Sequence, residues 1–270
     1  MDDKKLQFLQ IGNIIAVIST IIINGLANIL PIGGKYTWEL SDNIPNLFVP
    51  AGITFGIWGI IYILTILFSS YLAKDLFKKE KTTKPFLEKI SFLFILACLA
   101  NIIWIFLWHY EQVVLSLLLT LLLFFSLLFI YIRLKIGIDK IPLKEKLFIH
   151  LPISVYLGWA SVATVANITA VLVTLGWGDI AVSEQILWTI LVLIVITIIT
   201  ILMIIKRRDY AYIAVIIWAL LGIYLKRISV DPIYGIQSQI AYTAAIAILV
   251  IIIFAFLERF LLNNRKERNI

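Results

Sequence analysis

The chain has 270 residues, of which 62% are hydrophobic and 14% charged, and its mean hydropathy is +1.03. A water-soluble domain is about half apolar and carries about a quarter charged residues, so this composition excludes an ordinary soluble protein and indicates an integral membrane protein. The net charge of +7 would suit nucleic-acid binding, but basic residues in membrane proteins usually mark cytoplasmic loops instead.

Apolar runs bounded by charged residues predict eight membrane-spanning helices. In chain order they lie at residues 8–30, 50–72, 90–109, 113–134, 147–173, 185–205, 210–225 and 236–258. The seventh run has only about 16 residues and is the shortest for a full crossing. The expected fold class is therefore an all-α integral membrane protein with eight helices and no separate soluble domain.

Eight crossings place alternate loops on opposite sides of the membrane, and charge separates the two sides. Twenty of the 23 basic residues fall on the side that holds both termini, whereas Lys35, Lys226 and Arg227 fall on the other. Because basic loops remain cytoplasmic, the sequence predicts a multi-pass protein with both termini in the cytoplasm. The lipid bilayer of the cell (plasma) membrane is the expected environment, and no nucleic-acid partner is expected.

The predicted helices lack the ionisable residues that several membrane functions need. No Asp, Glu, Lys or Arg lies near the centre of any run, which counts against an ion-coupled pump. His109 and His150 fall on opposite sides of the membrane and cannot share a metal, and the single cysteine, Cys98, cannot form an internal disulfide. We therefore expect no metal site and no required cofactor, we identify no catalytic residue, and an enzyme is the less favoured interpretation.

Neutral amides supply most of the polarity at membrane depth. They are Asn13, Asn24 and Asn28 in the first run, Asn101 in the third and Asn167 in the fifth. An amide in hydrocarbon needs a partner, so each of them either bonds a neighbouring helix or contacts a ligand. Aromatic residues accompany Asn101 and Asn167, which favours ligand contact more strongly for these two.

Tryptophans divide into two groups by their depth in the runs. Trp108, Trp177 and Trp188 suit an aromatic belt at the membrane interface. Trp58, Trp104 and Trp159 lie deeper, where an indole can stack on a planar ligand, and they are candidates for a cavity wall.

Two other features bear on a cavity. Gly52 and Gly56 form a GxxxG pair that serves either close helix packing or space for a ligand. The long connection at residues 31–49 contains Trp38, Pro45 and Phe48, and such a loop is suited to fold over an opening between helices as a lid.

Three separated stretches resemble one family, the translocator protein or tryptophan-rich sensory protein family. The family's second-helix signature is similar to NLFVPAGITFGIWGIIYIL, which carries Pro50, Phe55, Trp58 and Tyr62. Its third-helix pattern, Leu-x-Asn-x-x-Trp, is similar to LANIIW, which carries Asn101 and Trp104. Its fifth helix resembles LPISVYLGWASVATVANITAVL, which carries Pro152, Tyr156, Trp159, Ala163, Thr164 and Asn167.

The resemblance implies a five-helix bundle over residues 1–175 with a pocket for flat hydrophobic ligands under the first extracytoplasmic loop. Family members bind porphyrins such as protoporphyrin IX and haem, some bind sterols, and homodimers are usual. Certain bacterial members have been proposed to degrade protoporphyrin in light. The ligand-binding residues that the resemblance implies are Trp38, Phe48, Pro50, Phe55, Trp58, Tyr62, Asn101, Trp104, Tyr156, Trp159, Ala163 and Asn167.

The sequence also departs from the family pattern in three places. The usual proline pair at the start of the second helix is Pro50 followed by Ala51, and the tryptophan common at the start of the fourth helix is missing. Residues 176–270 lie beyond the resemblance and are expected to form a three-helix membrane extension packed beside the five-helix bundle. The extra helices could cover the surface that a homodimer would use.

These observations lead to one preferred function and two alternatives. We expect a membrane-embedded binding or sensory protein for a planar hydrophobic ligand, with a tetrapyrrole such as protoporphyrin IX or haem as the preferred candidate and a sterol-like molecule as another. The alternatives are a transporter or exporter of a small hydrophobic solute and a tetrapyrrole-degrading enzyme.

Overall fold

The computed structural model describes residues 3–78, 85–230 and 237–267, and all regular secondary structure in these ranges is helical. The eight long helices are α1 (Asp3–Ile29), α3 (Ile57–Ala73), α5 (Leu93–His109), α6 (Val113–Arg133), α8 (Leu151–Thr174), α9 (Val182–Arg207), α10 (Tyr210–Val230) and α11 (Ser238–Glu267). Each corresponds to one of the eight predicted runs, so the all-α prediction is confirmed. An α-helix satisfies every backbone polar group within its own segment, which is what lipid demands.

Short helical segments connect the long helices. They are η1 (Ile32–Gly34), α2 (Thr37–Asn43), η2 (Gly52–Gly56), α4 (Pro85–Ile90), α7 (Leu143–Glu145), η3 (Lys146–His150) and η4 (Trp177–Asp179). Two of them replace helix ends that the sequence predicts as regular. The second run begins with the 3-10 turn η2, and the fifth begins with the π-helical turn η3. The π turn precedes Pro152, which has no N–H to continue the regular hydrogen-bond pattern.

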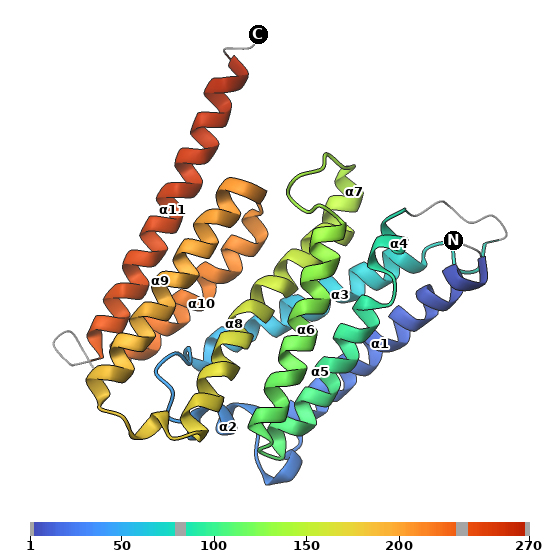
Figure 1. Cartoon of the computed structure of the whole chain (residues 1–270). Helices are drawn as coiled ribbons and strands as arrows, with labels where there is room; N and C mark the ends of the chain where they lie inside the picture. The colour runs from blue at the N-terminus through green and yellow to red at the C-terminus, as the bar shows by residue number, and fades with distance from the viewer. Residues whose placement is uncertain (1–2, 79–84, 231–236, 268–270) are drawn as a thin grey trace.

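Length and apolar composition make this a multi-pass membrane protein. In the described ranges, 7 helices are long and apolar enough to cross a membrane, and α5 is a shorter apolar helix of 17 residues. The seventh predicted run, which looked too short, is the 21-residue helix α10. Figure 1 shows α1 beginning and α11 ending at the same end of the bundle.

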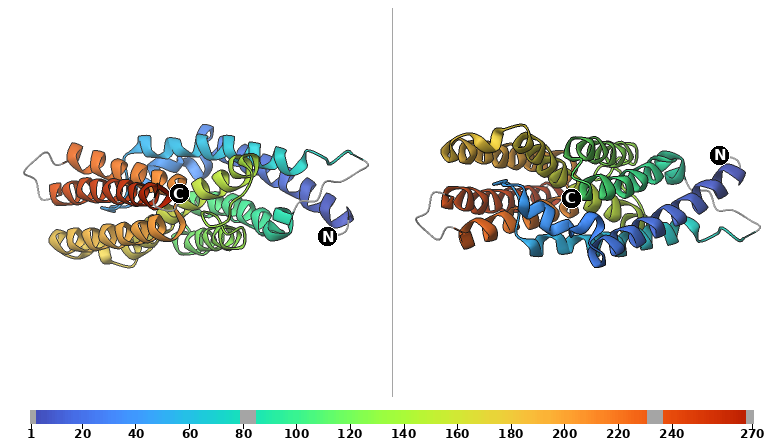
Figure 2. Two further views of the ribbon diagram at one scale, coloured as in Figure 1. Left: turned by 90° about the horizontal axis from the view of Figure 1, so that it is seen from above. Right: turned by 90° about the horizontal axis from the view of Figure 1, so that it is seen from below.

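Helix α8 lies in the middle of the assembly and packs against α3, α6 and α10. Figure 2 shows α9, α10 and α11 gathered at one side of the molecule and α1, α5 and α6 at the other. Helix α10 approaches α8 closely because Gly158 has no side chain: a Cβ there would lie 3.0 Å from Val215 Cβ. The Tyr212 hydroxyl also donates a hydrogen bond of 3.2 Å to Ser161 Oγ. The C-terminal helices are therefore joined to the rest of the bundle through α10.

Candidate functional site

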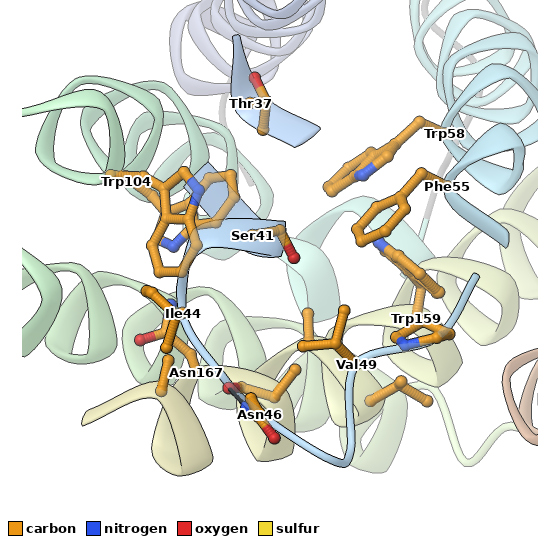
Figure 3. Close-up of a pocket in the computed structure, with 16 residues that line it drawn as sticks. Thr37, Ser41, Ile44, Asn46, Val49, Phe55, Trp58, Trp104, Trp159 and Asn167 are labelled. Atoms are coloured by element: carbon orange, nitrogen blue, oxygen red, sulfur yellow. Dashed lines mark hydrogen bonds between the residues drawn. The ribbon is translucent and has the colours of Figure 1, made fainter. Parts of the chain in front are cut away.

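An aromatic cavity opens between η2, α3, α5 and α8 at the end of the bundle where α2 lies (Figure 3). It is lined by Thr37, Ser41, Ile44, Asn46, Val49, Pro50, Phe55, Trp58, Trp104, Trp108, Trp159, Val162, Ala163, Ala166, Asn167 and Ala170. None of these 16 residues is charged, and four of them are tryptophans. Such a lining favours a ligand with large apolar faces.

The aromatic rings form two walls that face each other across the cavity in Figure 3. On one wall, Trp159 meets Phe55 edge to face at 5.9 Å between ring centroids and Trp58 at 6.2 Å. On the other wall, Trp104 and Trp108 stack at 5.7 Å with an angle of 17° between their planes. Each of these rings contacts another aromatic ring, which restricts its movement.

The space between the walls is narrow. It amounts to about 670 Å³ when the open mouth is included, but the centre of a water molecule could occupy only about 80 Å³ of it. A second cavity of about 500 Å³, again with its open part included, adjoins it. The two share Thr37, Phe55, Trp58 and Trp104. A large planar ligand would therefore have to displace side chains or a segment that lines the cavity.

The segment of residues 35–49 contributes five residues to the cavity lining and is attached at both ends. The Asn46 amide donates to Thr169 Oγ1 on α8 at 2.5 Å, and its oxygen accepts from the Phe48 backbone N–H at 2.9 Å. At the other end, Thr37 Oγ1 lies 3.2 Å from His109 Nε2, next to the ion pair of Lys35 with Glu111. The segment therefore lies against the cavity, and its action as a lid stays a prediction.

Seven of the twelve predicted site residues line the aromatic cavity. They are Pro50, Phe55, Trp58, Trp104, Trp159, Ala163 and Asn167. Tyr62 lines the adjoining cavity and stacks on Trp58 at 5.8 Å. Three separate stretches of the sequence therefore converge on one place.

The other four predicted residues lie elsewhere. Tyr156 is buried behind Trp58, which it meets edge to face at 6.1 Å. Phe48 is buried and lines a different cavity, beside Trp177 and Trp188 on the α9 side. Asn101 is buried between α5 and α1, away from the cavity lining. Trp38 belongs to α2, but its side chain is outside the described part of the chain.

The buried amides bond neighbouring helices. Asn24 Nδ2 donates to Asn101 Oδ1 at 2.7 Å and thereby joins α1 to α5. Asn167 Oδ1 accepts from Ser116 Oγ, and its Nδ2 donates to Thr120 Oγ1, both at 3.2 Å across to α6. Asn101 therefore has a packing role, whereas Asn167 packs against α6 and also lines the cavity.

We predict that Asn101→Leu lowers stability without affecting a ligand in the aromatic cavity. Loss of the Asn24 contact should cost about 1 kcal/mol, because amide bonds between membrane helices are modest in strength. Thermal unfolding in detergent would measure the loss, and Asn24→Leu in the Asn101→Leu background should add little to it. Additive losses would show that the two amides act independently.

Nine of the 16 lining residues were not among the predicted site residues, and Trp108 and Asn46 illustrate why. Trp108 was assigned to the interfacial belt but is buried, and its position four residues after Trp104 puts both on one helix face. That spacing was a usable signal. Asn46 gave no signal, because its partner Thr169 is distant in sequence. Among the described residues, Gly52 and Gly56 do not mediate close packing, since a Cβ at either would meet nothing within 4 Å.

Comparison with known proteins adds one finding. A family model described as TSPO-like protein matches residues 10–257. The match extends through α9 and α10 into α11, so it does not separate residues 176–270 from the earlier helices. Searches of curated proteins and of solved structures found no match.

Proposed function

The chain belongs to the TSPO-like protein family, a family of membrane binding and sensory proteins, and we propose that it binds a planar hydrophobic ligand in the aromatic cavity. The preferred ligand class is a tetrapyrrole. The observation that carries the proposal is the convergence of Phe55, Trp58, Trp104 and Trp159 on one uncharged cavity. Stacking between two aromatic walls supplies affinity for a flat conjugated ring.

Unused hydrogen-bond donors in the walls fit such a ligand. The indole N–H groups of Trp104 and Trp159 are buried and have no acceptor among the described residues. A buried donor without a partner is costly, so an acceptor on the ligand would stabilise the complex. The carboxyl oxygen atoms of a porphyrin such as protoporphyrin IX are acceptors of this kind.

The lining offers no side chain that usually binds the iron of an iron-containing tetrapyrrole. It contains no histidine, cysteine or methionine, the side chains that usually bind haem iron. Stacking and hydrogen bonds would therefore hold either form without an axial bond from the cavity wall. On this basis protoporphyrin IX is a better first ligand to test than haem.

The cellular arrangement is part of the proposal. Because α1 begins and α11 ends at one end of the bundle, we place both termini on the cytoplasmic side of the plasma membrane, where the basic residues concentrate. The cavity and its lid then lie at the opposite, extracytoplasmic end.

Titration of the detergent-purified protein with protoporphyrin IX tests the proposal. We expect saturable one-site binding, seen as tryptophan quenching and a shifted porphyrin absorption band. Trp159→Phe should weaken binding by about tenfold, because it removes part of the stacking surface and one indole donor. Trp188→Phe removes a half-exposed tryptophan outside the aromatic cavity and is the matched control. Absence of binding to the wild-type chain at micromolar porphyrin would contradict the proposal.

A further inference from the structure

Helix α10 contacts the backbone that carries one wall of the aromatic cavity, although it contributes no lining residue. The Ala51 N–H donates to the Gly222 carbonyl oxygen at 2.9 Å. The Trp218 indole N–H donates to the Thr54 carbonyl oxygen at 2.9 Å. These bonds attach α10 to both ends of a short stretch that begins just before η2.

The fit at Gly222 is closer than any side chain permits. A Cβ on this residue would overlap Thr54 Oγ1 and would lie 2.9 Å from Pro50 Cβ. Gly222 is therefore needed for the contact, because the backbone of α10 at this residue lies directly against the side chains of Pro50 and Thr54. Pro50 and Phe55, which flank this contact in sequence, both line the cavity.

Helix α10 also contacts α8, the other element that carries this wall of the cavity. Its residues Tyr212 and Val215 pack on α8 at Ser161 and Gly158, as described above. Trp159 projects from α8 into the cavity, where it meets Phe55 from η2 edge to face. Helix α10 thus spans the back of the wall and holds η2 and α8 at a fixed separation.

We infer that α10 is a positioning element for the aromatic cavity, acting through Trp218 and Gly222 on η2, so that the C-terminal helices control ligand affinity without touching the ligand. The inference rests on the proposed function for its ligand arm. The claim that α10 holds η2 in place does not depend on any ligand. A wall displaced by about 1 Å is expected to lose much of its preorganised stacking.

Ala51→Pro isolates one hydrogen bond of this contact. The φ angle of Ala51 is −60°, which proline adopts without strain, so the change chiefly removes the N–H that donates to Gly222. Ala51→Ser keeps that N–H and is the matched control. Gly222→Ala tests the close approach, and Gly59→Ala is its control because a Cβ at Gly59 meets nothing within 4 Å. Trp218→Phe is a milder third variant that removes the indole donor and part of the ring but keeps an aromatic side chain.

Two measurements are needed on each variant. Hydrogen exchange of peptides covering residues 47–58, in the ligand-free protein, reports whether η2 is held. Protoporphyrin titration reports affinity. We expect faster exchange and binding weakened by about tenfold or more in Ala51→Pro and Gly222→Ala, a smaller change in Trp218→Phe, and wild-type behaviour in both controls.

The outcomes separate this inference from the proposed function. Unchanged exchange in both Ala51→Pro and Gly222→Ala would overturn the inference, whatever binds. Faster exchange with unchanged affinity would overturn the positioning role and leave the cavity proposal standing. Absence of porphyrin binding in the wild type would contradict the proposed function, and exchange would still decide whether α10 holds η2.

Discussion

Gly137→Ala is expected to destabilise the chain by about 2–4 kcal/mol, the largest loss that we predict for a single added methyl group. Gly137 has φ +81°, and a Cβ on it would overlap the carbonyl oxygen of Arg207 at the end of α9. The loop after α6 docks at this point: Ile136 is buried and accepts a hydrogen bond of 3.3 Å from Arg207 Nη1. Because the overlap is with backbone, a side-chain rearrangement cannot relieve it.

Thermal unfolding in detergent measures this loss, with Gly34→Ala as the matched control. Gly34 has nearly the same conformation, φ +83°, but a Cβ there would meet nothing within 4 Å. Gly34→Ala should therefore cost only the strain of the backbone conformation, about 1 kcal/mol. Equal losses in the two variants would show that strain alone accounts for the effect. Porphyrin binding should survive in Gly137→Ala, because the loop lies at the opposite end of the bundle from α2 (Figure 1).

The eight helices could be predicted because the requirement of a bilayer is local. A stretch of apolar residues must satisfy its own backbone in lipid, so length and hydropathy are sufficient to locate it. The ends of the helices were harder to predict from the sequence. Nothing in the run that begins at residue 50 distinguishes the 3-10 turn η2 from the α-helix that follows it at Ile57. The predicted run ends at residue 225, before the charged residues Lys226 and Arg227, but α10 continues through both of them to Val230.

The cavity was partly predictable, because the depth of a residue in the membrane and its spacing along a helix can both be inferred from the sequence. Depth alone identified Trp58, Trp104 and Trp159, and all three line the cavity. The roles of the buried amides could not be predicted in the same way. Whether Asn101 faces a ligand or another helix depends on Asn24, 77 residues earlier in the chain, which approaches it only in the folded bundle.

The role of α10 had no sequence signal at all. Its contact with η2 uses a backbone carbonyl of Gly222 and a backbone N–H of Ala51, and every residue other than proline carries such groups. A glycine within an apolar run is also common in membrane helices. Only the approach of the two segments in space gives Gly222 its importance.

Ala163→Phe should abolish porphyrin binding while the chain stays folded. Ala163 lies on α8 among the cavity lining, four residues after Trp159, and its methyl group leaves open the space between the two aromatic walls. A phenyl ring in that space would occupy the position proposed for the ligand. We expect affinity to fall by at least about a hundredfold, which is about 2.8 kcal/mol. The titration described above measures it directly.

Stability separates blocking from unfolding in this experiment. Overpacking a filled core costs about 1–3 kcal/mol, but a ring that enters an empty cavity gains contacts, so the unfolding temperature of Ala163→Phe should change little. Ala214→Phe, at an exposed position of α10, adds the same ring outside the cavity and should leave both stability and binding unchanged. Full porphyrin affinity in a folded Ala163→Phe protein would place the ligand elsewhere in the bundle, because a ring between the walls and a tetrapyrrole cannot share the space that the side chains leave there.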